Sequence, residues 1–395
     1  MTTHVFIVND DTFPTHLQFL FAGTGAYSQR EKYWVDWHIG LLSDIKRVRA
    51  GDLVIFYMEA SAETKGGFYG IFEVADQNPL VFHTPKKNGF LPNLPNNKLI
   101  YRILLEPREV YSEGVTEWEA LDKLPVYATE LQWSLIYRKL KGKRGCTPLL
   151  PWEAQRLTDM IRNKNSGKLV ANGQFTGGFD WDDQDRKIIC TSSRERYPFQ
   201  RRYSFNPLEA IWYVQNYQES YETHLKNGPP SWKVSPQHLR RNRSYESYLQ
   251  LYFTENIGVD TSLDPVIGNS VVWFGIEVAC GVGMQKMDIL TICQNDERRE
   301  YRIVELKDEP AKPSVVDQIE YYVNWASQDN GKHLDGAFDW NIQPVIVAPP
   351  HSPRDWEDIL AAFRGYNQKH VSLPILYFEF TVPNKRSINF RELKY

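Results

Sequence analysis

The succession of patterned segments between residues 244 and 380 constrains the fold more than any other feature of this chain. Apolar residues at helical spacing predict helices over 244–257, 314–327 and 353–365. Runs rich in β-branched and aromatic residues predict strands over 271–279, 287–293, 301–307, 342–348 and 373–380. The order of helix, three strands, helix, strand, helix and strand predicts an α/β core with a mixed sheet.

Three side chains on neighbouring strands of this core are candidates for chemistry. Asp288 opens the strand 287–293, and Glu305 lies near the end of the next strand, two residues before Lys307. Side chains alternate across a strand, so Glu305 and Lys307 face the same way. The polar turn QNDERRE allows a hairpin, which brings Asp288 beside Glu305 if the register permits. Glu277, one strand earlier, is a rival acid, and Asp288 is preferred because its strand adjoins that of Glu305.

These residue types fit a metal-dependent hydrolase. Two carboxylates and an ammonium within an apolar run are costly to bury unless something pairs them. A hard divalent cation, Mg²⁺ or Mn²⁺, would pair these carboxylates and lower the pKa of a bound water. A nearby lysine can orient or help deprotonate that water and stabilise the pentacovalent phosphorus. The alternative is a solvent-facing ion pair of Glu305 and Lys307 on an edge strand. The apolar neighbours Ile303, Val304 and Leu306 favour a buried strand and the catalytic interpretation.

The order of elements, with Asp on one strand and Glu-x-Lys on the next, resembles the PD-(D/E)XK nuclease superfamily over roughly residues 240–380. Two further features match. Glu246 stands on the first helix, where this superfamily often has a glutamate. Gln318 and Tyr322 form the Gln-x-x-x-Tyr of RecB-like members on the helix after Glu-x-Lys. Met287 stands before Asp288, where the superfamily motif has proline.

The resemblance implies a role for each matched residue. Asp288 and Glu305 would bind the metal ion together with the backbone carbonyl of Leu306, and Lys307 would activate the attacking water. The remaining matched residues would support the active site, Glu246 as a second acid together with Gln318 and Tyr322. Ordinary core packing is the alternative for the tyrosine.

The N-terminal part has a different pattern. Short β-branched and aromatic runs predict strands over 4–8, 53–58, 68–74 and 100–105. Apolar spacing predicts helices over 33–49, 128–140 and 151–162. Residues 163–187 contain few aliphatic residues and many of Gly, Asn and Asp, which predicts a linker. The expected organisation is a β-rich domain over 1–162, a linker with an intermediate helical segment over 163–237, and an α/β domain over 238–395.

The strings WHIGLLSDIKRVRAGDLVIFYMEA, GGFYGIFEVA and LQWSLIYRKLKGKRGCTPLLPWE resemble the PUA-like superfamily, in particular EVE and YTH-type domains. The resemblance implies a β-barrel that binds nucleic acid and stacks a flipped, modified base between aromatic rings. The candidate rings are Trp34, Trp37, Tyr57 and Trp133, each with core packing as its alternative. The candidate phosphate contacts are Lys139, Lys141, Lys143 and Arg144, joined by Arg240, Arg241 and Arg243, for which a solvated basic cluster is the alternative.

Composition narrows the class of protein. A formal net charge of −3 argues against binding nucleic acid through bulk positive charge, so any such site must be local. The four cysteines show no CxxC spacing, which fits a reducing cytoplasm. The N-terminus lacks the pattern of a signal peptide, and no apolar run reaches the roughly 18 residues of a membrane span. A cytoplasmic protein is expected.

Together the two resemblances predict a PUA-like β-barrel followed by a PD-(D/E)XK restriction-endonuclease-like core. The expected function is Mg²⁺-dependent cleavage of DNA phosphodiester bonds, directed by a modified-base reader, as in modification-dependent restriction and defence. A homodimer is expected, because each active site would cut one strand. The alternatives are a nuclease of DNA repair or RNA processing that recognises structure, and a nucleic-acid-binding protein without catalysis.

Overall fold

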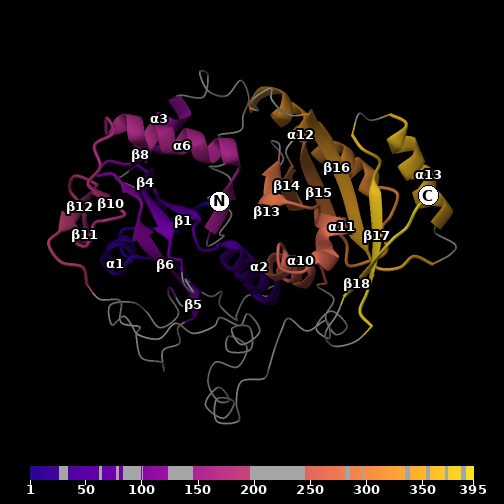
Figure 1. Ribbon diagram of the computed structural model, residues 1–395, viewed down its shortest axis with the longest axis horizontal. Coiled ribbons are helices and arrows are strands. Elements are labelled where there is room, and N and C mark those ends of the chain that lie inside the picture. Colours follow the sequence, from indigo (N-terminus) through magenta and orange to yellow (C-terminus); the bar gives the residue numbers. More distant parts are fainter. Residues whose placement is uncertain are drawn as a thin grey trace, which may run out of the picture. The chain divides into compact units, whose positions relative to one another are not determined.

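The computed structural model describes fourteen stretches of the chain: residues 1–25, 34–61, 65–76, 80–82, 99, 101–122, 146–195, 245–280, 285–295, 298–333, 339–352, 356–369, 372–383 and 388–395 (Figure 1). Contacts divide the chain into two compact units. Unit 1 comprises Met1–Trp34 and Asp44–Asn206, and unit 2 comprises Val35–Ser43 and Pro207–Tyr395. Both contain helices and strands, so the expected two-part α/β architecture is confirmed at this level.

The sheet of unit 1 contains the strands that the N-terminal pattern predicts. Its strands are β1 (Thr3–Val8), β2 (Phe21–Thr24), β3 (Leu53–Met58), β4 (Gly67–Val74), β5 (Leu80–Phe82), β6 (Tyr101–Pro107), β8 (Val115–Thr116) and β9 (Cys146–Leu149). The order is β2-β6-β4-β3-β1-β9, with β5 on β6 and β8 on β4. Only β1 and β3 pair in parallel among these described strands.

The sheet of unit 1 curls into a half-barrel (Figure 1). The strands β2 and β9 end the order of paired strands within the described residues, so these strands do not close into a barrel. The barrel was expected from the PUA-like resemblance. The structure therefore supports a β-rich α/β unit, and the assignment to the PUA-like superfamily stays a prediction.

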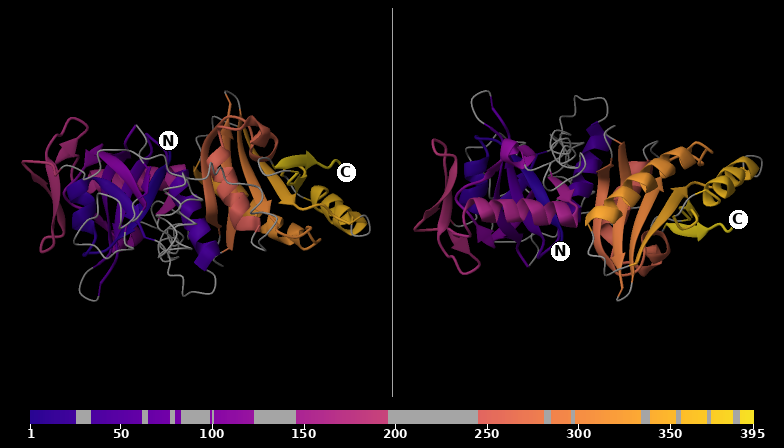
Figure 2. Two further views of the ribbon diagram at one scale, coloured as in Figure 1. Left: turned by 90° about the horizontal axis from the view of Figure 1, so that it is seen from below. Right: turned by 90° about the horizontal axis from the view of Figure 1, so that it is seen from above.

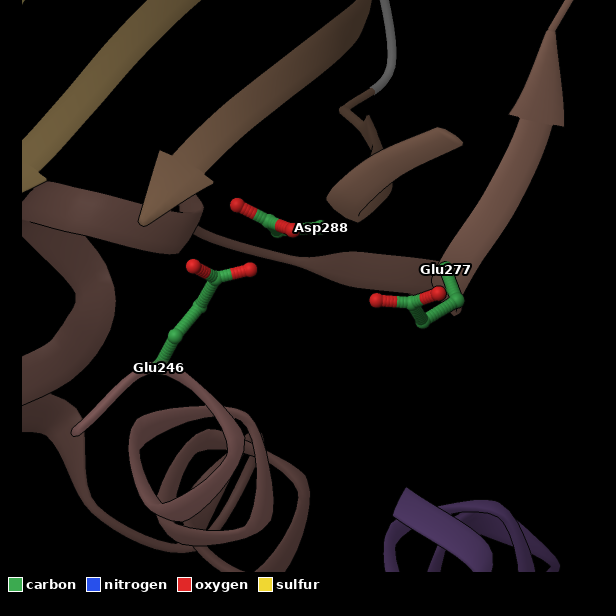
Figure 3. Close-up of side chains that lie close together, drawn as sticks. All are labelled: Glu246, Glu277 and Asp288. Carbon is green, nitrogen blue, oxygen red and sulfur yellow. The ribbon is translucent and has the colours of Figure 1, made fainter. Parts of the chain in front are cut away.

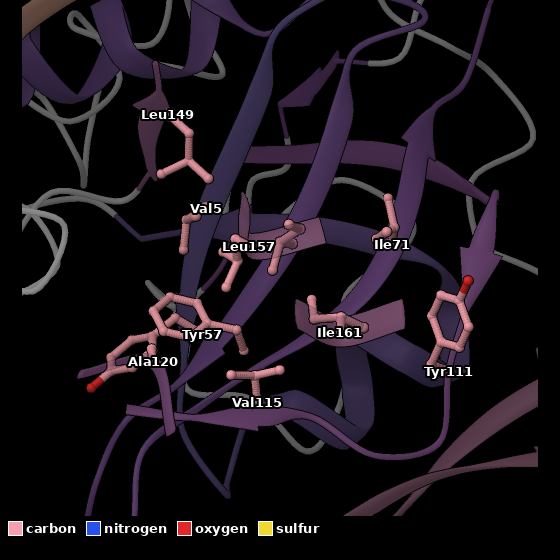
Figure 4. Packing of buried hydrophobic residues seen from close by; sticks show 11 residues of the cluster. Val5, Tyr57, Ile71, Tyr111, Val115, Ala120, Leu149, Leu157 and Ile161 are labelled. Atoms are coloured by element: carbon pink, nitrogen blue, oxygen red, sulfur yellow. The ribbon is translucent and has the colours of Figure 1, made fainter. Parts of the chain in front are cut away.

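Helices in the N-terminal half are α1 (Phe13–Phe19), α2 (Trp34–Arg47), α3 (Glu117–Asp122) and α6 (Pro151–Lys164). Helix α6 begins at a proline, whose missing N–H is not needed in the first turn, and Glu153 accepts a 2.8 Å hydrogen bond from the Leu150 N–H just before it. Its buried residues Leu157 and Ile161 pack in one cluster with Val5 and other side chains of the sheet (Figure 4). The helices predicted at 33–49 and 151–162 are confirmed, and 128–140 lies outside the described residues.

The linker predicted at 163–187 is wrong. This segment contains β10 (Ala171–Asn172), which pairs with β7 (Glu109–Val110), and β11 (Gly178–Asp182), which pairs with β12 (Lys187–Thr191) as an antiparallel hairpin. Trp181 makes edge contacts at 4.9 Å with Phe13 and 5.0 Å with Tyr69, measured between ring centroids. The Gly, Asn and Asp residues mark turns between short strands, and burial of a few large aromatic side chains anchors these strands to the rest of unit 1.

Unit 2 has the order of elements that its pattern predicts. The helices are α10 (Tyr245–Asn256), α11 (Asp264–Ile267) with the short 3₁₀ helix η1 (Thr261–Leu263) before it, α12 (Val315–His333) and α13 (Trp356–Asn367). The strands are β13 (Val271–Cys280), β14 (Gln285–Gln294), β15 (Arg298–Leu306), β16 (Asp339–Ala348), β17 (Leu376–Thr381) and β18 (Asn389–Glu392). The elements η1, α11 and β18 are additions that the sequence pattern does not predict.

The six strands among the described residues of unit 2 form one mixed sheet in chain order. Strands β13, β14 and β15 pair antiparallel, β15, β16 and β17 pair parallel, and β18 returns antiparallel to β17. Helix α12 connects the parallel strands β15 and β16 and runs along them (Figure 2). This crossover places the chain that follows β15 beside α12. In the described part of the chain, no helix combines the length and the apolar character that crossing a membrane requires.

Candidate active site

Asp288 and Glu305 meet on paired strands, as the sequence predicts. The register that pairs Ile289 of β14 with Val304 of β15 places Asp288 opposite Glu305, on the same face of the sheet. The Leu306 N–H donates a 2.7 Å hydrogen bond to Oδ2 of Asp288. Both acids are buried, with 6% of Asp288 and 2% of Glu305 exposed. The condition on register is therefore fulfilled.

Lys307 is held by a chain of hydrogen bonds that ends on α12. Its ammonium pairs with Oε1 of Glu305 and donates a 3.1 Å hydrogen bond to Oε1 of Gln318. Gln318 Nε2 donates to the Tyr322 hydroxyl at 2.7 Å, and that hydroxyl donates to the Lys286 carbonyl at 2.7 Å. The Gln-x-x-x-Tyr pair thus orients the lysine, and Tyr322 has a polar role as well as a buried ring.

The position of β15 in the sheet decides between the two interpretations of Glu305 and Lys307. Strand β15 lies between β14 and β16, so it is not an edge strand. Glu305 is almost completely buried, and the Lys307 side chain is 28% exposed. The alternative of a solvent-facing ion pair on an edge strand is therefore wrong.

Glu246 and Glu277 complete a cluster of carboxylates. Glu246, in the first turn of α10, Glu277 of β13 and Asp288 each place a carboxylate oxygen within 4.8 Å of the others (Figure 3). The register that pairs Ile276 with Ile289 aligns Glu277 with Asp288. Glu277 was treated as a rival of Asp288, and the structure brings both acids into one cluster. The backbone of Glu277 is in the left-handed region, with φ of 52°, although the residue lies within strand β13.

Two polar residues of this cluster were missed by the sequence analysis. Gln250 Nε2 donates to Oε1 of Glu277 at 3.1 Å and to Oδ1 of Asp288 at 3.3 Å. Lys286 Nζ donates to Oε2 of Glu277 at 3.0 Å. Simple spacing could have found both. Gln250 follows Glu246 by one helical turn, and Lys286 precedes Asp288 by two residues and so faces the same side of its strand.

Burial and mutual repulsion favour the protonated forms of these acids. Burial and then the negative charges of Glu305 and Glu246 raise the pKa of Asp288 well above its usual value. Burial also raises the pKa of Glu305 and of Glu246, although Lys307 opposes the shift in both cases. Burial alone would lower the pKa of Lys307, but the surrounding carboxylates outweigh it and raise this pKa, which keeps the side chain an ammonium.

The donor set fits a hard divalent cation. Oε2 of Glu305 is buried and accepts no hydrogen bond from any described residue. With all four carboxylates of Glu246, Glu277, Asp288 and Glu305 ionised, the two ammonium groups of Lys286 and Lys307 would leave a formal charge of −2. A divalent ion would cancel this charge and give the unpartnered oxygen a ligand role. The Leu306 carbonyl as a further ligand stays a prediction.

The structure supports none of the candidate base-binding residues of the N-terminal part in the way that it supports the acidic cluster. Trp34 and Trp37 belong to α2, but their side chains lie outside the described residues. Tyr57 is 4% exposed and lies in the core of unit 1, where its ring centroid is 5.1 Å from that of Phe68 (Figure 4). This is the environment of a packing residue, and it leaves no face of the ring open for stacking on a base. The other candidates also lie outside the described residues: Trp133, Lys139, Lys141, Lys143, Arg144, Arg240, Arg241 and Arg243.

The chain matches no protein-family model and no curated protein. Among solved structures, a hypothetical protein from Leishmania major is 12% identical, with a TM-score of 0.28, over 42% of this chain and 96% of that one. The restriction endonuclease FokI is 11% identical, with a TM-score of 0.22, over 54% of this chain and 37% of its own. FokI bound to DNA is 12% identical, with a TM-score of 0.24, over 74% and 52%. Scores at this level establish no common fold, so function is inferred from the geometry of the site.

Proposed function

We propose that unit 2 is a divalent-metal-dependent nuclease that hydrolyses phosphodiester bonds of DNA. One observation carries the proposal. Two buried acids from paired strands stand opposite each other, one of them with an unpartnered oxygen, beside a lysine that is anchored from α12. Structural ion pairs rarely leave a buried carboxylate oxygen unsatisfied, because the cost of desolvation is then not recovered.

The residues of the site divide the work of hydrolysis. Asp288 and Glu305 would hold Mg²⁺ or Mn²⁺, which lowers the pKa of a bound water and screens phosphate charge. Two N–H groups of Lys307 bond to Glu305 and Gln318, and the third has no partner among the described residues. That N–H can donate to the attacking water or to a non-bridging phosphate oxygen. The water gives up a proton to solvent as its oxygen bonds to phosphorus, the bond to one ester oxygen breaks, and the departing oxygen takes up a proton from solvent.

The finer part of the proposal is the target. We propose that the N-terminal half directs cleavage to DNA that carries a modified base, as in modification-dependent restriction, and that two copies of the chain act together to cut both strands. The resemblance of the N-terminal sequence to EVE and YTH-type domains supports this targeting. The structure adds no aromatic pocket to it within the described residues.

The test is cleavage of plasmid DNA with and without modified cytosine, in Mg²⁺ or in EDTA. The double variant Glu305→Ala, Lys307→Ala should lose at least about a thousandfold in rate. A matched control exists nearby, because Glu309 and Lys312 form an exposed ion pair with side chains 75% and 76% exposed. The control double variant Glu309→Ala, Lys312→Ala should cut at the wild-type rate.

Each other outcome refutes a different part of the proposal or favours one of the alternative functions. Cleavage that persists in Glu305→Ala, Lys307→Ala would refute the site. Equal cutting of modified and unmodified plasmid would refute the targeting and leave the nuclease. Cutting of RNA alone would indicate RNA processing. Binding of nucleic acid by the wild type without any cutting would indicate a binding protein.

A further inference from the structure

Lys286 is a second lysine that reaches the carboxylate cluster from a different strand. It lies two residues before Asp288 on β14, so the two side chains share one face of the sheet. Its Nζ lies 3.0 Å from Oε2 of Glu277, and carboxylate oxygens of Glu277 and Asp288 lie within 4.8 Å of each other. The cluster is thus bordered by Lys307 at the end of β15 and by Lys286 near the start of β14.

The two lysines differ in how fully their ammonium groups are used. Lys307 bonds to two side chains and is 28% exposed, whereas Lys286 bonds only to Glu277 among the described residues and is 36% exposed. Its backbone is fixed, because its carbonyl accepts the hydroxyl hydrogen bond of Tyr322. Lys286 is therefore a positioned cation with unused N–H groups that a large polyanion can reach.

The chain maintains this arrangement at a cost. A glutamate with φ of 52° in mid-strand is strained, and such strain persists only where surrounding contacts enforce it. Here the Glu277 carboxylate is held by Gln250 on one oxygen and by Lys286 on the other. The contact with Lys286 is thus one of two that hold the carboxylate of this strained residue at the cluster.

We infer that Lys286 binds a DNA backbone phosphate next to the one that is cut. The inference rests on the proposed nuclease function and deepens it. Phosphates of one strand follow each other about every 3.4 Å along the helix axis, so a strand whose scissile phosphate lies at Asp288 and Glu305 brings further phosphates to the rim of the site. A cation with unused N–H groups is what such a phosphate requires, and the four carboxylates would otherwise repel it.

The competing explanation is that Lys286 only neutralises Glu277. A double-mutant cycle separates the two roles, with KM and kcat for cleavage of a short DNA duplex as readouts over a range of salt concentrations. Lys286→Gln should raise KM about tenfold, act less on kcat, and reduce the salt slope of binding by about one. Lys286→Arg should restore most of the affinity. Lys369→Gln, an exposed lysine of the same unit, is the control.

The decisive comparison is made in the Glu277→Gln background, where Lys286 has lost the carboxylate that it pairs with. A rise in KM on adding Lys286→Gln there supports a phosphate contact. No change there, or a loss of kcat with KM constant, overturns it. Wild-type protein that cuts no DNA refutes the nuclease function and this inference with it, whereas an active wild type with an unresponsive cycle refutes the inference alone.

Discussion

Asp288 accepts a hydrogen bond from the backbone N–H of Leu306, at 2.7 Å, across the two strands that carry the site. This bond fixes one oxygen of the carboxylate to the neighbouring strand, and the other oxygen accepts from Gln250 on α10. The acid is therefore positioned by three elements before any ion binds. Preorganisation of this kind is what a metal site requires to bind and orient its ligand set with little rearrangement.

Binding of a divalent ion should stabilise the protein. Addition of Mn²⁺ or Mg²⁺ at about one hundred times its dissociation constant should raise the free energy of unfolding by about 2.7 kcal/mol, because only the folded state offers the site. Thermal unfolding with metal and with EDTA measures the shift. Asp288→Asn should abolish it, whereas Glu309→Gln, an exposed acid, should retain it. An unchanged shift in Asp288→Asn would place the ion elsewhere.

Tyr322→Phe should slow cleavage about tenfold, because Gln318 loses the hydroxyl that fixes it and therefore positions Lys307 less well. The free energy of unfolding should fall by about 1 kcal/mol, since two partly buried polar groups lose a partner. Single-turnover cleavage and urea unfolding measure these effects. Tyr321→Phe is the matched control, because that hydroxyl makes only a long 3.5 Å contact. Wild-type rates in Tyr322→Phe would contradict the anchoring role.

His16 should make unit 1 sensitive to acid. Burial lowers the pKa of its ring from 6.5 to about 4, while its Nδ1 lies 2.9 Å from the Phe21 carbonyl. The ring of His16 takes up a proton below pH 6.5 in the unfolded chain and only below about 4 in the folded chain. The contribution of His16 to the free energy of unfolding is therefore fully present above pH 6.5 and is lost as the pH falls from 6.5 to about 4. The loss amounts to about 3 kcal/mol.

The contribution of His16 is isolated by His16→Gln, which keeps a donor for the Phe21 carbonyl and does not titrate. Urea unfolding at several pH values from 7 to 4 should show a shallower decline for the variant than for the wild type. Parallel curves for the two proteins would show that the ring is not the group that responds.

The hairpin of β11 and β12 should be essential to unit 1. Trp181→Ala should lower the free energy of unfolding by about 3 to 5 kcal/mol, because it removes a buried ring from the contacts with Phe13 and Tyr69. Ile189→Ala, on the same hairpin but 41% exposed, should change it by less than about 0.5 kcal/mol. Equal effects of the two substitutions in urea unfolding would contradict the anchoring role of Trp181 and favour the interpretation of this segment as a linker.

Local sequence determined the secondary structure of unit 2 and half of its site. The runs that became β14 and β15 are rich in residues that favour a strand, and α12 shows its apolar stripe, so the elements and the shared face of Glu305 and Lys307 follow from spacing alone. The same spacing placed Gln318 and Tyr322 one helical turn apart. These are relations within one element, where the period of the backbone fixes which side chains lie together.

Only the tertiary structure decided which elements meet. The register of β13 against β14 aligned Glu277 with Asp288, and packing brought Gln250 of α10 to both acids. The aromatic residues of 163–187 found their partners on α1 and β4, although their own neighbours are mostly turn residues. Strand pairing and burial depend on residues far apart in the chain. The spacing of residues within one element does not specify these contacts, because they form only when segments far apart in the chain pack together.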